Sequence, residues 1–271
     1  IMVVVKLAVL LMFAAIAFTA FDTDHFQGFW DKGVGGVTAA ASTIFFSYIG
    51  LDAVSTAGDE VRDPQRTMPK AILGALLTVT AVYLLVSVSA LGAQPTAAFG
   101  SAEQANAGLS VLLEDITGAT WSATVLAAGA VVSISSVTLV VMYGQTRILF
   151  AMGRDGLLPT FFARVNPRTM TPINNTVVVA VASGLLAGFV PLEHLLDIVS
   201  IGTLVAFIVV SVGVILLRIR EPDLPRGFRV PLYPVTPVLS VLACLWVLSG
   251  LHWSTWVWFG LWVSAALVFY L

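Results

Sequence analysis

Two ionisable side chains lie inside apolar stretches of the sequence, where a charge is expensive to hold. Lys6 is the only Lys or Arg within a run long enough to cross a membrane, and Asp52 follows the apolar run that ends at Gly50. An ionisable group at membrane depth costs about 2.5–3.5 kcal/mol on insertion scales, so such groups mark functional sites by default. An amine or a carboxylate in a poorly solvated cavity can release or take up a proton. Proton handling is therefore the first candidate chemistry.

The depth of each ionisable group leaves two interpretations open. About 15 residues, or about 22 Å of helix, separate Lys6 from Phe21, which leaves Lys6 roughly 8 Å from the inner surface of a ~30 Å core. The ammonium can therefore face a cavity, or it can snorkel to the headgroups. Asp52 lies about 10 Å inside the membrane if the chain to Asp59 is helical. It is either a proton-handling or gating acid, or a structural acid that is capped by backbone amides or paired with a helix expected ahead of Ile1.

A third candidate is the backbone of the sequence FFSYIG at residues 45–50. Glycine costs about 1 kcal/mol relative to alanine in a helix interior, so a helix is easily interrupted at Gly50. Carbonyls at a helix end lose their amide partners and carry partial negative charge, which suits a ligand ammonium. Phe46, Ser47, Ile49 and Gly50 are thus candidate binding residues. The alternative is a kinked but otherwise ordinary span.

Ser135 and Ser136 add two neighbouring hydroxyls, within the run ISSVTLVVMYGQTR. They lie toward the inner half of an apolar segment and offer oxygen ligands to a cation. Serine hydroxyls in membrane helices also bond back to their own helix, and the residues alone favour that interpretation.

The composition predicts that helices embedded in a membrane position these groups. The chain has 271 residues, of which 58% are hydrophobic and only 10% charged, and its mean hydropathy is +0.97. A soluble domain carries roughly 25% charged residues. One cysteine, Cys244, excludes a disulfide framework. Apolar runs predict an all-α protein with about eight transmembrane helices, at residues 1–20, 34–57, 69–92, 120–145, 174–190, 195–217, 233–250 and 255–271.

The distribution of basic residues predicts the orientation. All but Lys6 and Lys32 of the 13 Lys and Arg fall in alternate loops, after the second, fourth and sixth spans. The positive-inside rule makes those loops cytoplasmic, so both ends of the chain are expected inside the cytoplasmic membrane. The long outer loop at 93–119 is expected to hold a short helix over the opening. Gly184 and Gly188 predict a close helix contact.

Four stretches resemble one family of membrane proteins. They are FFSYIGLDAVSTAGDEVRDPQRTMPKAI (45–72), MYGQTRILFAMGRDGLLP (142–159), SIGTLVAF (200–207) and RGFRVPLYPVTP (226–237). Their order and sequence are similar to the amino acid–polyamine–organocation (APC) transporters, and most similar to the cationic amino acid transporter branch. The resemblance runs nearly end to end.

The resemblance implies a twelve-helix inverted-repeat fold with a broken helix near residues 46–50. Residues 1–271 would be a single transport domain holding the fifth to twelfth spans, with four spans expected ahead of Ile1. It also implies roles. Lys6, in VVVKLAVLLMF, matches a lysine that replaces a sodium ion in proton-coupled members, and Ser135 and Ser136 would face it. The turn at Phe46–Gly50 would hold the substrate α-amino group, with Phe46 as a lid.

The leading hypothesis is therefore a secondary active transporter that moves amino acids with protons as the coupling ion, by alternating access. The expected partners are an amino acid and the lipid bilayer, with no nucleic acid and no cofactor. The alternatives are a membrane-embedded enzyme and a receptor-like bundle. The sequence has no HExxH or GxSxG motif and no pair of intramembrane aspartates. A receptor bundle does not need a broken span beside an intramembrane lysine.

Overall fold

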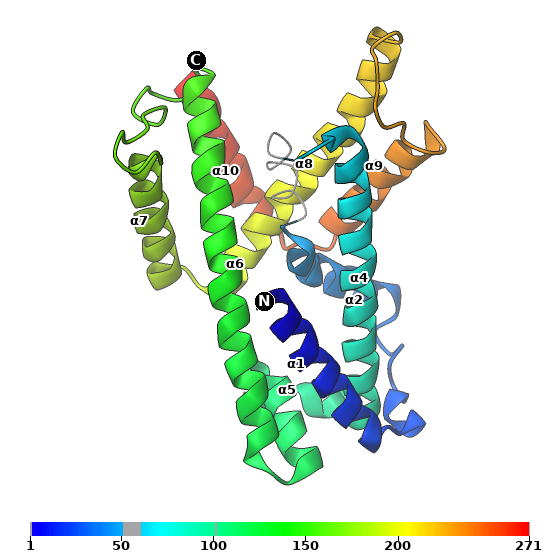
Figure 1. Ribbon diagram of the computed structural model, residues 1–271. Helices are drawn as coiled ribbons and strands as arrows, with labels where there is room; N and C mark the ends of the chain where they lie inside the picture. Colours follow the sequence, from blue (N-terminus) through cyan, green and yellow to red (C-terminus); the bar gives the residue numbers. More distant parts are fainter. Residues whose placement is uncertain (1, 51–60, 101, 271) are drawn as a thin grey trace. The chain divides into compact units, whose positions relative to one another are not determined.

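The structure is a computed structural model that describes residues 2–50, 61–100 and 102–270. Every regular element in these ranges is helical, which confirms the expected all-α class. The longer helices are α1 (Met2–Ala17), α2 (Gly33–Ile44), α4 (Pro64–Ala93), α5 (Ala102–Thr117), α6 (Thr120–Arg154), α7 (Ile173–Phe189), α8 (Leu192–Arg220), α9 (Val235–Leu248) and α10 (Trp253–Tyr270) (Figure 1). Short 3₁₀ turns are η1 (Phe18–Ala20), η2 (Thr23–Phe26), η3 (Phe45–Tyr48) and η5 (Thr96–Gly100).

The chain forms two compact units. The first comprises Ile1–Asp31 and Lys70–Thr176, and the second comprises Lys32–Pro69 and Val177–Leu271. The first unit therefore contains α1, α5, α6 and most of α4. The second contains α2, most of α7, and α8 to α10.

In the first unit, α1 and α5 both pack against the N-terminal half of α6 (Figure 1). The core is apolar and is built around Phe13, Leu112 and Leu113, each at most 1% exposed, with Leu126 from α6 beside them. The end of α4 joins this core through Ala90. The helix expected in the loop at 93–119 is confirmed as α5, which places apolar side chains on the same cluster as α1 and α6.

A close contact fixes the C-terminal end of α4 in the same unit. A Cβ atom at Gly92 would lie 2.1 Å from Cδ2 of Phe21, so only glycine admits the ring. The Gly92 carbonyl accepts a hydrogen bond from the Asp22 amide at 2.8 Å, and Nδ1 of His25 lies 2.6 Å from the same oxygen. These bonds satisfy a carbonyl that the helix end leaves without an amide partner.

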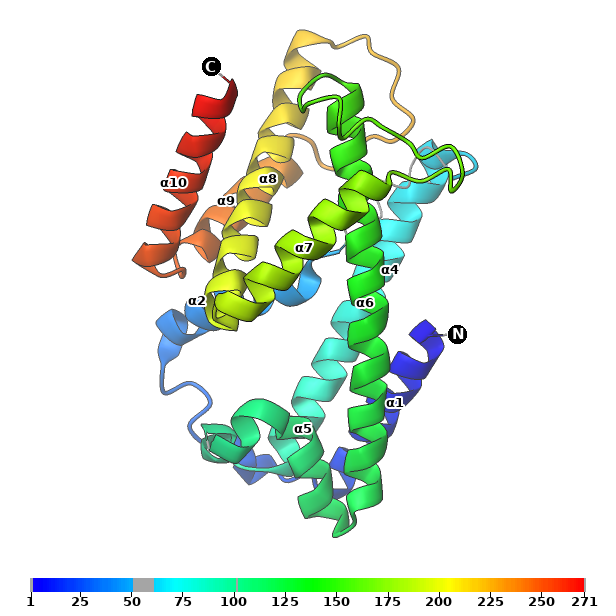
Figure 2. The same cartoon turned by 90° about the vertical axis from the view of Figure 1, so that its left-hand side faces the viewer.

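In the second unit, α8 packs against α9 and α10, and α2 contacts both α8 and α9 (Figure 2). Ile201 and Leu204 of α8 meet Cys244 and Leu248 of α9 in the apolar core. The close packing expected at Gly184 and Gly188 of α7 is not present: a Cβ at either glycine would meet no heavy atom within 4 Å among the described residues.

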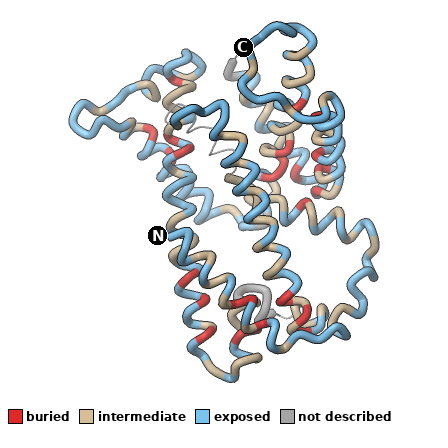
Figure 3. Tube along the Cα trace, turned by 45° about the vertical axis from the view of Figure 1, so that its right-hand side comes forward, coloured by how far each residue is buried: buried red, intermediate tan, exposed pale blue. Residues whose placement is uncertain are grey.

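Most large apolar side chains point away from these cores, and pale blue dominates the trace in Figure 3. Leu77 of α4 is 70% exposed and Ile134 of α6 is 67% exposed. A soluble protein would bury such residues. In a membrane they contact lipid tails or neighbouring helices, which are equally apolar, so their exposure here costs no hydrophobic free energy.

The number of helices that qualify as spans differs from the expected eight. Four helices in the described part are individually long and apolar enough to cross a membrane: 2–20, Pro64–Ala93, Thr120–Arg154 and His194–Arg220. Two further helices, α9 and α10, qualify only together and are bent by 115°. At ~1.5 Å per residue, the 14 residues of α9 cover about 21 Å, less than a ~30 Å core. Helix α7 has 17 residues, the lower limit for a span.

Candidate functional site

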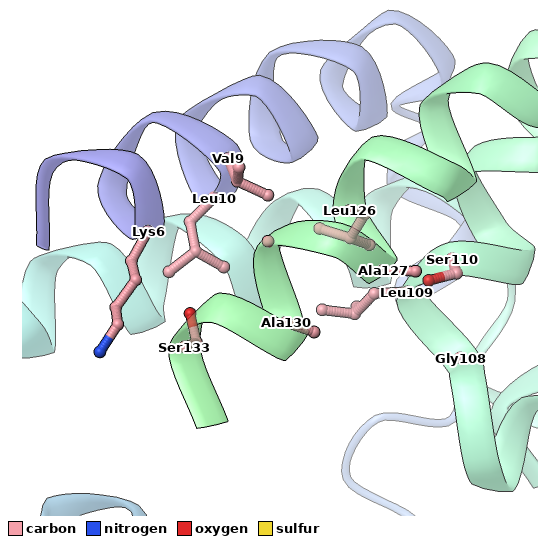
Figure 4. Close-up of a pocket in the computed structure, with 11 residues that line it drawn as sticks. Lys6, Val9, Leu10, Gly108, Leu109, Ser110, Leu126, Ala127, Ala130 and Ser133 are labelled. Carbon is pink, nitrogen blue, oxygen red and sulfur yellow. The ribbon is translucent and has the colours of Figure 1, made fainter. Parts of the chain in front are cut away.

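Lys6 lines a cavity between α1, α5 and α6 in the first unit. The cavity has a volume of about 600 Å³, and its walls are mainly apolar, including Leu10, Leu109 and Leu126. Its polar side chains are Lys6, Ser110 and Ser133. Figure 4 shows Lys6 extending from α1 beside the facing turn of α6, where the Ser133 hydroxyl points toward α1. The lysine is half-buried and has the mainly apolar wall of the cavity beside it.

The packing of α1 on α6 positions this pair of side chains. A Cβ atom at Gly129 would lie 2.9 Å from both methyl carbons of Val9, so α6 approaches α1 closely only because residue 129 has no side chain. Lys6 precedes Val9 by three residues, and Ser133 follows Gly129 by four. Residues three or four apart share a helix face, so the glycine contact sets Lys6 and Ser133 in the same groove.

The two serines predicted to face Lys6 do not line this cavity. Ser135 is exposed and Ser136 is half-buried. On a helix that advances about 100° per residue, Ser135 lies some 200° around from Ser133, on the opposite side. Ser133 was not predicted, because the family resemblance pointed to Ser135 and Ser136 instead. The signal that could have found it is Gly129, which lies one turn earlier and marks the face of α6 that a neighbour approaches.

The interruption expected near residues 46–50 begins at the end of α2. The α-helix stops at Ile44, and Phe45–Tyr48 continue as a 3₁₀ turn. Ile49 is extended, with φ −67° and ψ 138°, and Gly50 has φ +116°, a region that side chains disfavour. The predicted second half of this span, including Asp52, lies outside the described residues.

The turn that follows α2 presents both a ring and backbone oxygens. The Phe46 side chain is 41% exposed. Its carbonyl accepts a hydrogen bond from the Ile49 amide at 3.1 Å, so this oxygen is already partnered once inside the turn. A carbonyl has two lone pairs and can accept a second bond. Ser47, Tyr48 and Gly50 also have interactions within the structure.

Two contacts hold this turn in the second unit. Phe45 packs edge-on against Phe207 of α8, with ring centroids 6.1 Å apart. One turn earlier, the buried Ser42 hydroxyl donates to the Val247 carbonyl at 2.5 Å. The ring contact and the hydrogen bond fix the end of α2 against α8 and α9, which gives the interruption a rigid frame.

Charged residues of the basic loops form mostly exposed contacts. Nε of Arg66 lies 4.0 Å from an oxygen of Asp63, and Nε of Arg154 lies 3.5 Å from an oxygen of Asp155. Arg147 lies over the Tyr143 ring, 4.9 Å from its centroid. Exposed ion pairs contribute about 0–1 kcal/mol to stability. These charges are therefore better explained by their effect on membrane topology than as an ion-pair gate that closes the transport path.

Fold and site together define a polytopic helical membrane protein, in which α2 ends in a 3₁₀ turn and a lysine lies within a candidate membrane span. A family model described as "Amino acid permease" matches residues 1–271. The chain belongs to the amino acid permease family, which confirms the resemblance to the APC transporters.

Individual relatives differ in what they are named for. Branched-chain amino acid permease BcaP of Bacillus subtilis (strain 168) is 42% identical over 270 residues, which cover 100% of this chain and 57% of that protein. Methylthioribose transporter of the same organism is 37% identical over 270 residues, 100% of this chain and 58% of that protein. Cationic amino acid transporter 4, vacuolar, of Arabidopsis thaliana is 38% identical over 197 residues, 73% of this chain and 32% of that protein. The chain thus spans a little over half the length of these two Bacillus subtilis proteins.

Proposed function

We propose that the chain is part of a proton-coupled transporter that moves amino acids across the cytoplasmic membrane by alternating access. The observation that carries the proposal is Lys6, a lone cation in an apolar cavity, in a chain whose full length matches the amino acid permease family. The basic loops favour a cytoplasmic location for both ends of the chain.

The proposed coupling step is a change in the charge of Lys6. A charged ammonium in an apolar cavity needs oxygen partners, because an unpaired charge is costly there. The Ser133 hydroxyl, which lines the same cavity, can supply one such partner without holding the lysine permanently charged, as a carboxylate would. When the lysine is protonated, its charge favours the packed arrangement of α1 and α6. When the proton leaves, that attraction is lost and the helices are free to separate.

The proposed substrate contact is the turn after α2. A helix C-terminus carries partial negative charge, which favours the ammonium of an amino acid near Phe46–Gly50. The extended Ile49 and the positive φ of Gly50 turn the backbone out of the helix at this point. The exposure of Phe46 at the same turn supports the proposed role of its ring as a cover over the bound molecule.

The names of the relatives define the substrates to test, since they range from branched-chain and cationic amino acids to methylthioribose. The complete protein that carries this chain, reconstituted in proteoliposomes, should accumulate at least one of leucine, valine, arginine or methylthioribose when a proton gradient is imposed. Collapse of the gradient with an ionophore should abolish accumulation. Equal uptake with and without the gradient would remove proton coupling, and no uptake of any compound would favour a receptor-like or enzymatic role.

A further inference from the structure

A second cavity, of about 480 Å³, is formed by the end of α8 and the loop that follows it. Its lining includes three arginines, Arg218, Arg226 and Arg229, together with Asp223 and two prolines, Pro222 and Pro225. All of these residues come from one continuous segment of the second unit. The cavity is therefore built from a single stretch of the chain, in which Gly227 also packs against Gln65 of α4.

Arg226 builds the wall of this cavity. Its Nη1 donates to the carbonyls of Pro222 at 2.9 Å and Leu224 at 3.1 Å. Its Nη2 donates to the carbonyls of Leu217 at 3.4 Å and Glu221 at 2.5 Å. The guanidinium thus satisfies carbonyls at the end of α8 and offsets the partial negative charge of that helix end. Four of its five donors are used, so Arg226 shapes the cavity and the other two arginines are left to bind.

Arg218 and Arg229 keep their charge available. The Arg218 guanidinium carbon lies 4.5 Å from the centroid of the Tyr233 ring, and a stacked guanidinium still presents N–H donors at its edge. Arg229 is exposed. Neither arginine is in an ion pair within the part of the chain that the structure describes. Asp223 is the single acid of the lining, so positive charge is in excess.

The length of α8 places this cavity near the membrane surface. Its 29 residues cover about 43 Å at ~1.5 Å per residue, whereas the hydrocarbon core is ~30 Å thick. The apolar run of the helix ends at Leu217, so its last turn and the loop reach the level of the lipid headgroups. Phosphate groups are abundant there, and arginine binds them through paired N–H donors.

We propose that this cavity binds a phosphate group between Arg218 and Arg229. The phosphate belongs either to an anionic lipid headgroup or to a free phosphate ion, and the chemistry of recognition is the same. Arg226 acts as a positioning residue that holds the loop open around the site. The site does not depend on the transport reaction.

The test measures binding to the complete protein purified in a neutral detergent. Phosphatidylglycerol, phosphatidylcholine and inorganic phosphate are added separately, retained lipid is counted by native mass spectrometry, and the thermal shift is recorded. The double variant R218Q/R229Q should lose phosphatidylglycerol affinity by about tenfold, since each basic residue near an anionic surface contributes to lipid binding. Arg220→Gln is the control for each single substitution, because it removes one charge from the same segment but does not line the cavity.

Each result either identifies the source of the phosphate group or overturns the proposed binding site. A shift with phosphatidylglycerol alone, lost in R218Q/R229Q and kept in Arg220→Gln, identifies the lipid headgroup as the source. An equal, arginine-dependent shift with inorganic phosphate identifies the free ion. Equal losses in Arg220→Gln and the double variant would overturn the proposal, because they would reflect general surface charge. If the double variant fails to fold, Arg229→Gln alone decides, since that exposed side chain has no hydrogen bond or ion pair in the described structure to lose.

Discussion

At the scale of single residues, Asn175 joins the first turn of α7 to the last turns of α6. Its side chain is fully buried, and Nδ2 donates to the Thr146 carbonyl at 3.2 Å and to the Phe162 carbonyl at 3.0 Å. Phe162 lies in the loop after α6, so a single amide holds three segments together. Its Oδ1 is buried without a hydrogen-bond partner in the described structure, so only the donor half of the amide is satisfied.

Replacing Asn175 with alanine should therefore lower the free energy of unfolding of the complete protein by about 1–3 kcal/mol, because a buried and a partly buried carbonyl lose their donor. The measurement is thermal denaturation in detergent. Asn174→Ala is the matched control: Asn174 donates one longer bond, to the Phe161 carbonyl at 3.3 Å, at a more exposed position. Equal effects of the two substitutions would show that burial of Asn175 does not stabilise this junction.

The sequence could identify Lys6 as unusual but could not indicate which hydroxyl lines its cavity. A lone lysine in an apolar run is visible from composition, because any charge there is costly. Which serine of the run SISS (residues 133–136) lines the cavity with Lys6 depends on the rotation of α6 about its own axis. That rotation follows from the Gly129 contact with Val9, which is a long-range packing fact. Asn175 was likewise hidden, since its burial requires the loop to fold back on α6.

At the scale of helices, the end of α2 depends on a glycine in the neighbouring turn. Gly250 follows α9, and a Cβ atom there would lie 2.2 Å from the Ser42 hydroxyl and 2.7 Å from the Thr38 carbonyl of α2. The Ser42 side chain could rotate, but the Thr38 carbonyl is backbone and cannot yield without moving the helix. The approach of α2 to α9 is thus set by the absence of a side chain at residue 250.

We expect Gly250→Ala to destabilise the complete protein by about 1–3 kcal/mol, the usual cost of overpacking. Gly184→Ala, in α7, provides the control because the added methyl would meet no described atom within 4 Å. At that position alanine should be neutral or stabilising, since glycine is about 1 kcal/mol worse in a helix interior. Denaturation midpoints of the two variants measure the difference. If Gly250→Ala unfolds at the wild-type midpoint, α2 and α9 are not in close contact.

Helix positions were largely predictable, whereas their ends were not. Long apolar runs separated by polar segments predicted α4, α6 and α8 because membrane-spanning helices have strong composition signals. Those helices extend further than the apolar runs: α6 continues to Arg154, nine residues beyond the predicted end. Polar residues continue a helix outside the hydrocarbon core, where composition no longer marks its path. The stop at Ile44 was found only to within a few residues, because Gly50 lies after a 3₁₀ turn.

At the scale of the whole molecule, the two candidate sites fall in different units. The Lys6 cavity belongs to the first unit, and the turn at Phe46–Gly50 belongs to the second. In the proposed mechanism, the proton and the substrate therefore act on separate bodies of the transporter. A ligand shifts a conformational equilibrium only through a difference in its affinity for the two states, so coupling requires both sites to favour the same state.

We expect Lys6→Met in the complete protein to abolish accumulation driven by a proton gradient, while substrate exchange at equal concentrations on both sides persists. Methionine keeps much of the length of the side chain but removes the charge, so the cavity stays filled and the titrating group is lost. Ser133→Ala should weaken accumulation less, because it removes one hydroxyl partner and leaves the ammonium. Uptake and counterflow in proteoliposomes, measured on the same preparation, separate driving force from binding.

Three controls make the result specific to the cavity. Lys70→Met removes an exposed lysine from α4, and Ser135→Ala removes a hydroxyl from the exposed side of α6. Both should retain wild-type accumulation, because neither residue lines the cavity. Lys6→Arg keeps a cation that does not deprotonate in proteins, so it should lock the charged arrangement and stop gradient-driven cycling. If Lys6→Met still accumulates substrate like the wild type, the lysine only snorkels, and the coupling proton must be carried by another group.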